Sequence, residues 1–178
     1  MILAFAGRRI DAAGTSSPRF PLANVALVRT RIRAVLEDRA TKAVVSSAAC
    51  GSDLITLAEV KALGLRRKIV LPFSRIKFRD TSVTDRPGDW GPVYDGILND
   101  AEASGDLIVL DEPLGDQAYL VVNETILDAA VAWMKTLHQP GCAVLVWDKK
   151  SRGDHDITEN FGIEARKRGM TVIEVPTL

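Results

Sequence analysis

The stretch KAVVSSAACGSD, residues 42–53, predicts the fold more directly than any other part of the chain. An apolar run suited to a buried strand passes into a series of small residues, and Gly51, Ser52 and Asp53 then open a helical pattern. A strand that leads through a tight turn into a helix is half of a β-α-β unit. Small side chains at such a turn let another group approach the backbone closely, so we expect the turn to be functional.

The same alternation extends along the whole chain. Strands that are apolar throughout and are joined by helices are typical of a parallel sheet covered on both faces. We therefore predict an α/β fold, a single Rossmann-like three-layer sandwich over residues 1–178 with a mostly parallel sheet of about six strands. The expected strands are 2–7, 42–46, 67–73, 106–110, 142–147 and 171–175, and the expected helices are 24–38, 52–63, 91–104, 116–137 and 157–168. The only long irregular stretch expected is 72–90, which we interpret as a functional loop.

The composition is that of an ordinary globular domain with no overall charge bias. The 178 residues include 23 basic and 23 acidic side chains, and 47% are hydrophobic. This balance predicts no general attraction to nucleic acid or to a membrane, and no apolar stretch approaches the roughly 20 residues of a membrane span. We expect a cytoplasmic protein with reduced Cys50 and Cys142, no membrane partner and no nucleic-acid partner. The oligomeric state stays open, with a homo-oligomer as one arrangement.

The residues that follow each strand are the candidate site, because ligands of doubly wound sheets bind at the carboxyl ends of the strands. Gly7, Arg8 and Arg9 follow the first strand. A glycine there permits a sharp turn, and a guanidinium can hold phosphate or carboxylate through two hydrogen bonds. The alternative is a solvated loop with one structural ion pair.

The end of the second strand has the features of a phosphate cradle. Ser47 and its small neighbours leave room, Gly51 allows close backbone approach, and the amides of a helix that begins near Ser52 can bind an anion. Asp53 would repel phosphate unless it binds a sugar hydroxyl, and the alternative is an ordinary helix start with tight packing. If the cradle exists, Gly51→Val should abolish ligand binding while most of the fold is retained. Cys50 is interpreted as a small packing residue.

Together these two strand ends resemble a known superfamily. Gly7-Arg8 followed by SSAACGSD (46–53) is similar to the SLOG superfamily, whose Rossmann-like domains include the DNA-processing protein A family and the cytokinin-activating phosphoribohydrolases. Tyr119 and Asn123 resemble the Tyr-x-x-x-Asn stretch of that group. The resemblance spans nearly the whole chain and implies a nucleotide or a nucleotide-derived messenger as ligand.

The loop before the last helix continues the resemblance. VWDKKSRGD (146–154) with Thr158 is similar to the Trp-Asp-Gly stretch of the superfamily. Trp147 can stack on a base or plug the sheet edge, Arg152 and Gly153 make a flexible basic turn, and Asp156 or Thr158 can cap the next helix.

In the expected loop 72–90, two side chains are candidates for reaching a phosphate. Arg79 and Ser82 can do so if the loop folds over the crevice as a lid. The aromatic residues Phe73, Phe78 and Trp90 are expected to anchor the loop to the body of the protein.

Departures from the superfamily limit the expected chemistry. The phosphoribohydrolase signature Pro-Gly-Gly-x-Gly-Thr-x-x-Glu is absent, Asp154 stands where a second glycine is expected, and Val122 replaces a common arginine. The Walker and Gly-x-Gly-x-x-Gly motifs are absent as well. His138 and His155 are assigned no chemistry, since neither has a partner at a diagnostic spacing.

We therefore expect a sensor-type binding module for a nucleotide or a nucleotide-derived small molecule, bound in a crevice at the carboxyl ends of the strands, with no required cofactor and no metal. The second option is a nucleotide N-glycosidase. Glu124, Asp53 and Glu159 are its candidate carboxylates, with no spacing that singles one out, and Glu124 beside Asn123 is the one we select. The third is an interaction protein with a vestigial crevice.

Overall fold

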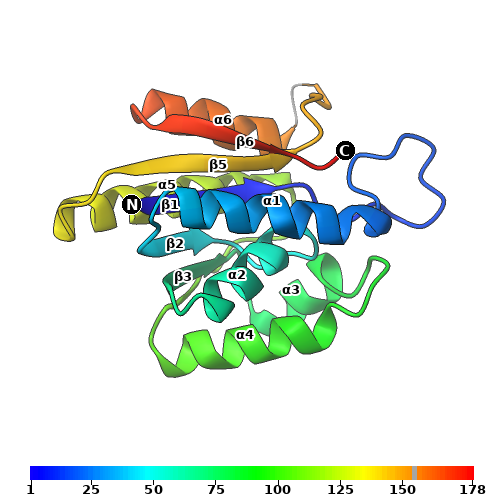
Figure 1. The fold of residues 1–178 in the computed structure, drawn as a ribbon. Helices are drawn as coiled ribbons and strands as arrows, with labels where there is room; N and C mark the ends of the chain where they lie inside the picture. The colour runs from blue at the N-terminus through cyan, green and yellow to red at the C-terminus, as the bar shows by residue number, and fades with distance from the viewer. Residues whose placement is uncertain (154–155) are drawn as a thin grey trace.

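The computed structural model describes residues 1–153 and 156–178, so the expectations placed on Asp154 and His155 lie outside the described residues. Helices and strands alternate along the chain (Figure 1). In order they are β1 (Ile2–Gly7), a 3-10 turn η1 (Leu22–Asn24), α1 (Val25–Asp38), β2 (Ala43–Ser46), α2 (Ser52–Ala62), β3 (Arg66–Leu71), α3 (Arg75–Ser82), α4 (Gly91–Ala103), β4 (Leu107–Val109), α5 (Asp116–Thr136), β5 (Gly141–Trp147), α6 (Ile157–Lys167) and β6 (Thr171–Pro176).

The strands form one six-stranded sheet in the order β4-β3-β2-β1-β5-β6. Every neighbouring pair is parallel. The predicted α/β sandwich is therefore confirmed. The chain adds strands on one side of β1 up to β4 and then crosses to the other side for β5, so the order reverses between β1 and β5. Open α/β sheets bind their ligands at such a switch point.

Alternate side chains of each strand enter two separate cores. Leu3 and Phe5 of β1 face α1, α2 and α4, whereas Ile2 and Ala4 face α5 and α6. In Figure 1, α1 and α2 lie in front of the sheet and α5 passes behind it. Because both faces are covered, the strands are apolar on both sides, which is why they appear as continuous apolar runs in the sequence.

The segment 72–90 is not the irregular loop that the sequence predicted. It contains the helix α3, which buries Phe78 and Ser82 on one face. A helix of eight residues with so few apolar positions has too short a pattern to be recognised from periodicity. The anchoring role of the aromatic residues is confirmed, since Phe73, Phe78 and Trp90 are all buried.

None of the described helices has the length and apolar character needed to cross a membrane.

Candidate functional site

A cavity of about 450 Å³ lies at the carboxyl ends of β1 and β2, bounded by the first turns of α5 and α6. Its volume is in the range of small-molecule sites. Most of the residues expected from the sequence line it: Gly7, Arg8, Arg9, Ser47, Asp53, Tyr119, Asn123 and Thr158. The remaining candidates do not: Gly51, Ser52, Arg79, Glu124, Trp147 and Gly153.

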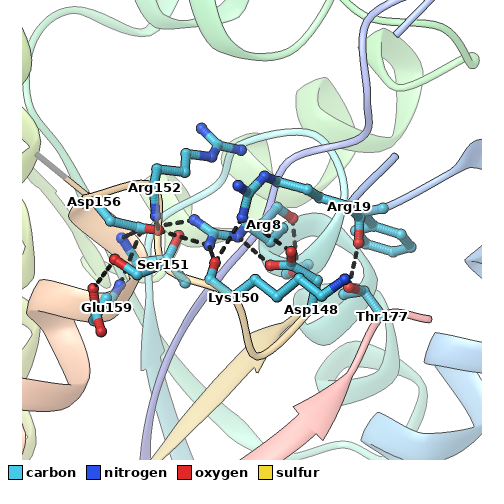
Figure 2. Close-up of polar contacts among 12 residues, drawn as sticks. Arg8, Arg19, Asp148, Lys150, Ser151, Arg152, Asp156, Glu159 and Thr177 are labelled. Carbon is cyan, nitrogen blue, oxygen red and sulfur yellow. Dashed lines mark hydrogen bonds and ion pairs between the residues drawn. The ribbon is translucent and has the colours of Figure 1, made fainter. Parts of the chain in front are cut away.

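Arg8 is the centre of a buried ion-pair network at the switch point (Figure 2). Its Nε donates to Asp148 Oδ1 over 2.9 Å, and its two terminal nitrogens donate to the two carboxylate oxygens of Asp156 over 2.6 and 2.7 Å. Nη2 also donates to the carbonyl oxygen of Lys150 over 2.7 Å. All three nitrogens of this guanidinium thus bind the segment between β5 and α6, so Arg8 holds that loop. The sequence offered two roles for Arg8: bidentate contact with a ligand, or one ion pair in a solvated loop. Neither role describes this arrangement.

Asp156 connects that network to the start of α6. Its carboxylate caps the helix by accepting from the backbone N–H of Thr158 and Glu159 over 3.0 and 3.1 Å, as the sequence predicted for this position. Although burial acts to raise the pKa of Asp156, the hydrogen bonds from Arg8 and from backbone amides outweigh it and lower the pKa to about 2. Asp156 therefore stays ionised and keeps the β1 and β5 loops together.

The expected phosphate cradle at the start of α2 is occupied by the protein itself. The Ser52 amide and its hydroxyl both donate to the carbonyl oxygen of Arg8, over 3.2 and 2.7 Å. The Cys50 amide donates to the Ser82 carbonyl over 3.0 Å. These donors hold the β1 exit and the end of α3, and they are not directed at the cavity.

Gly51 and Gly7 are small because the protein backbone, rather than a ligand, comes close to them. Gly51 has φ +98°, and a Cβ there would lie 2.8 Å from Ile10 N. A Cβ on Gly7 would lie 2.4 Å from Val146 O and 2.6 Å from Ser52 Oγ. Gly51→Val would therefore disturb the fold itself, contrary to the expectation that most of the fold is retained.

Asp53 is the buried carboxylate of the cavity. It lies in the first turn of α2 and is 8% exposed, and its Oδ2 accepts from the Ala49 amide over 3.1 Å. Burial raises the pKa of Asp53 to about 7, against the opposing effects of that hydrogen bond and of the nearby Arg9. Near neutral pH this side chain can accept a hydrogen bond as a carboxylate or donate one as an acid.

An apolar wall faces these charges. Phe78, Tyr119, Val122 and Ile126 line the cavity from α3 and α5. The Tyr119 hydroxyl is within 3.1 Å of Ser82 Oγ, which fixes the ring against α3. Val122, which stands where the superfamily commonly has an arginine, contributes to this apolar wall, in keeping with the departure noted in the sequence.

Asn123 performs a structural task at the edge of the cavity. Its Nδ2 donates to the Ile157 carbonyl over 2.8 Å and joins α5 to the first residue of α6. Its neighbour Glu124 is exposed and lies outside the lining. The helix therefore turns the amide inward and directs the candidate catalytic carboxylate away from the cavity.

Three other candidates lie apart from the cavity. Arg79 pairs with Asp95 of α4 over 3.0 Å, and its position on α3 places it on another surface. Trp147 is buried, with the Arg8 guanidinium 5.7 Å from its ring centroid, so it packs under the network. Gly153 has φ +91°, a conformation that favours glycine, and no described heavy atom beyond its chain neighbours lies within 4 Å of a Cβ placed there.

Arginines from three loops line the cavity and were not selected from the sequence as ligand contacts. They are Arg19, Arg86 and Arg152. Arg19 pairs with Asp148 over 3.0 Å, whereas Arg152 makes no ion pair with any described residue. Figure 2 shows the Arg152 side chain extending away from the carboxylates of the network. Arg152 is exposed, and partial desolvation together with the positive charge of Arg8 lowers its pKa. The basic turn at Arg152 was visible in the sequence, but nothing local distinguished Arg19 and Arg86 from other loop arginines.

The described residues contain no group of three or more His, Cys, Asp or Glu side chains placed to hold a metal ion.

Comparisons with known proteins assign the chain to no established group. No model of a known protein family matches the sequence. A search of curated proteins finds no significant match.

Proposed function

We propose that this protein is a SLOG-type binding module for a nucleotide or a nucleotide-derived small molecule. The observation that carries the proposal is a cavity at the sheet's switch point that combines a buried carboxylate, an apolar wall and an arginine with no ion-pair partner among the described residues. A nucleotide has an anionic, a hydroxyl-bearing and a flat apolar part, and the cavity offers a surface suited to each.

Arg152 is the proposed phosphate contact. The network around it contains three arginines, Arg8, Arg19 and Arg152, but only two carboxylates, Asp148 and Asp156, among the described residues. One positive charge is therefore uncompensated within this set. A phosphate group would balance it and relieve the repulsion among the guanidiniums, through the paired hydrogen bonds that arginine makes with phosphate.

The contacts of the ligand's hydroxyl-bearing part and of its flat part are assigned to the remaining residues that line the cavity. Asp53 is placed to hydrogen-bond a ribose hydroxyl or a base nitrogen, and the rings of Phe78 and Tyr119 offer an apolar surface for the base. This assignment leaves Arg8 and Asn123 as supports of the cavity, since their donors are used within the protein.

Thermal unfolding with a panel of nucleotides tests the proposal, because a ligand that binds only the folded state raises Tm. We expect at least one of AMP, cyclic AMP, NAD and ADP-ribose to raise Tm, and Arg152→Ala to weaken its binding by about tenfold. Arg39→Ala is the matched control, since Arg39 is exposed and follows α1 at the opposite end of the sheet. No stabilisation by any of the panel, or equal affinity in Arg152→Ala, would contradict the proposal.

A second candidate function is cleavage of a nucleotide N-glycosidic bond. It is favoured by one observation: burial raises the pKa of Asp53, inside the cavity, to about 7, which suits a residue that exchanges a proton. Prolonged incubation with the same nucleotides, followed by chromatography, decides between the two functions. Release of free base that is lost in Asp53→Asn and retained in Glu124→Gln would establish hydrolysis, whereas the binding module releases none.

A further inference from the structure

A second group of arginines lines the same cavity, away from the Arg8 network. Arg9 forms a hydrogen-bonded ion pair with Asp85, and Arg86 Nε lies 3.4 Å from the other oxygen of the same carboxylate. Arg9 comes from the β1 exit, while Asp85 and Arg86 belong to the segment between α3 and α4. One carboxylate is thus shared by two guanidiniums.

The hydrogen bonds of these arginines are incomplete. The Nε atoms of Arg9 and Arg86 are both buried and have no hydrogen-bond partner among the described residues. A buried N–H group without a partner carries a free-energy penalty that an acceptor would remove. The two Nε atoms have almost no accessible surface, so an anion in the cavity would reach the terminal nitrogens of Arg9 and Arg86, and the Nε–H groups would report on it indirectly.

This group lies on a different side of the cavity from Arg152. Arg9 forms an isolated bridge with Gly51, which places it beside the start of α2. Arg152 belongs to the loop after β5, on the opposite side of β1. The two groups therefore come from loops on opposite sides of the central strand.

Two other titratable side chains lie near Arg9. One is Cys50, whose thiol pKa is raised by burial so that it is uncharged at neutral pH, and the other is Asp53. Burial raises the pKa of Asp53 to about 7, so it is mostly uncharged near pH 6. At that pH, the group formed by Arg9, Arg86 and Asp85 has two positive charges and one negative charge, so one positive charge is in excess within it.

We infer that Arg9 and Arg86, held by Asp85, form a second anion subsite that accepts a phosphate group. Asp85 is a positioning residue, because it orients both guanidiniums but opposes the anion by its charge. The inference rests on the proposed function for the identity of the whole ligand, which then carries two separated anionic groups rather than one.

Inorganic phosphate is the first probe, and the resonances of the arginine Nε–H groups are the readout. In NMR spectra recorded near pH 6, we expect phosphate to shift the Nε–H signals of Arg9 and Arg86, assigned by comparison with Arg9→Lys and Arg86→Lys. If neither signal moves at millimolar phosphate, the subsite is refuted.

Two variants that change the charge of this group in opposite directions distinguish an effect on ligand binding from damage to the fold. Arg86→Ala leaves a neutral Arg9–Asp85 pair, and we expect phosphate affinity to fall by about fivefold. Asp85→Asn keeps an oxygen acceptor for Arg9 but removes the opposing charge, so affinity should rise by about the same factor. Arg39→Ala should leave it unchanged. An Asp85→Asn variant that binds phosphate more weakly than the wild type would overturn the inference.

Nucleotides distinguish the subsite from the proposed function. Adenosine 3′,5′-bisphosphate should bind about tenfold more tightly than AMP, and Arg86→Ala should abolish this advantage. If both nucleotides bind equally and Arg86→Ala changes neither, the second subsite is refuted while nucleotide binding stands. If neither nucleotide binds but phosphate still shifts the two signals, the subsite stands as an anion site and the nucleotide proposal fails.

Discussion

Replacing Asp53 by asparagine should make this protein more stable at alkaline pH. The pKa of the Asp53 carboxyl, ordinarily 3.8, is raised by burial to about 7 in the folded protein. The contribution of this carboxyl to stability is therefore fully present only below the pKa that it has in the unfolded chain. It is lost as the pH rises toward the pKa that it has in the folded protein. Above neutral pH the folded state bears the cost of a buried charge, and asparagine removes that charge while it retains an oxygen acceptor for the Ala49 amide.

The size of the effect follows from the two pKa values. A difference of about three pKa units at about 1.4 kcal/mol each gives a cost of about 4 kcal/mol at alkaline pH, as an upper bound. Between about pH 5 and pH 8 the cost should grow by roughly 2–3 kcal/mol. This is a large fraction of the stability of a domain, which is what a carboxylate retained for ligand contact would impose.

Guanidinium chloride unfolding of the wild type and Asp53→Asn at several pH values measures the difference directly. Other titrating groups are common to both proteins, so they cancel in the comparison. Asp116→Asn, which changes an exposed carboxylate of the same cavity, is the control. A difference between wild type and Asp53→Asn that stays constant from pH 5 to pH 8 would refute the reasoning, as would a less stable variant at pH 8.

Three further predictions concern the groups around the cavity. Arg8→Met should lower the free energy of unfolding by about 3–5 kcal/mol in denaturant titrations, because it leaves Asp148 and Asp156 buried without the Arg8 cation. A loss below about 1 kcal/mol would contradict this prediction. Gly51→Ala should lower Tm clearly more than Gly153→Ala. Both glycines have a positive φ, but only Gly51 has described backbone atoms near the new Cβ. Equal losses of Tm in the two variants would show that packing is unimportant at Gly51. Acidification should destabilise the wild type more than Asp156→Asn. The Asp156 carboxyl has a pKa of 3.8 in the unfolded chain and about 2 in the folded protein, so its charge stabilises the fold above pH 3.8 and ceases to do so as the pH falls toward 2. Parallel pH profiles of unfolding for the two proteins would argue against it.

The expected elements match the observed ones closely wherever the apolar pattern was long. The predicted helix 116–137 is α5, Asp116–Thr136, and the predicted strand 142–147 is β5, Gly141–Trp147. The helix α3 was missed because its eight residues carry too little periodicity. The position of the site was predictable for a related reason, since the carboxyl ends of parallel strands must share one edge of the sheet.

The roles of individual residues were less predictable than their location. Gly51 was expected to admit a ligand, but its φ and its contact with Ile10 belong to the β1 exit. Arg8 was expected to face either a ligand or solvent, but it is bound by carboxylates about 140 positions away, at Asp148 and Asp156. Glycine and arginine have several uses at a strand end, and only the three-dimensional neighbours select one of them.

The sequence by itself determined the α/β sandwich and the edge of the sheet at which the cavity lies. Apolar periodicity is a local property, and it fixes which segments become strands and which become helices. The tertiary structure alone decided the charge of the cavity. An arginine is free for an anion only if no carboxylate reaches it, and that depends on which distant loops meet. Arg8 and Arg152 are both loop arginines in the sequence, but folding gives two buried carboxylates to Arg8 and no described ion-pair partner to Arg152.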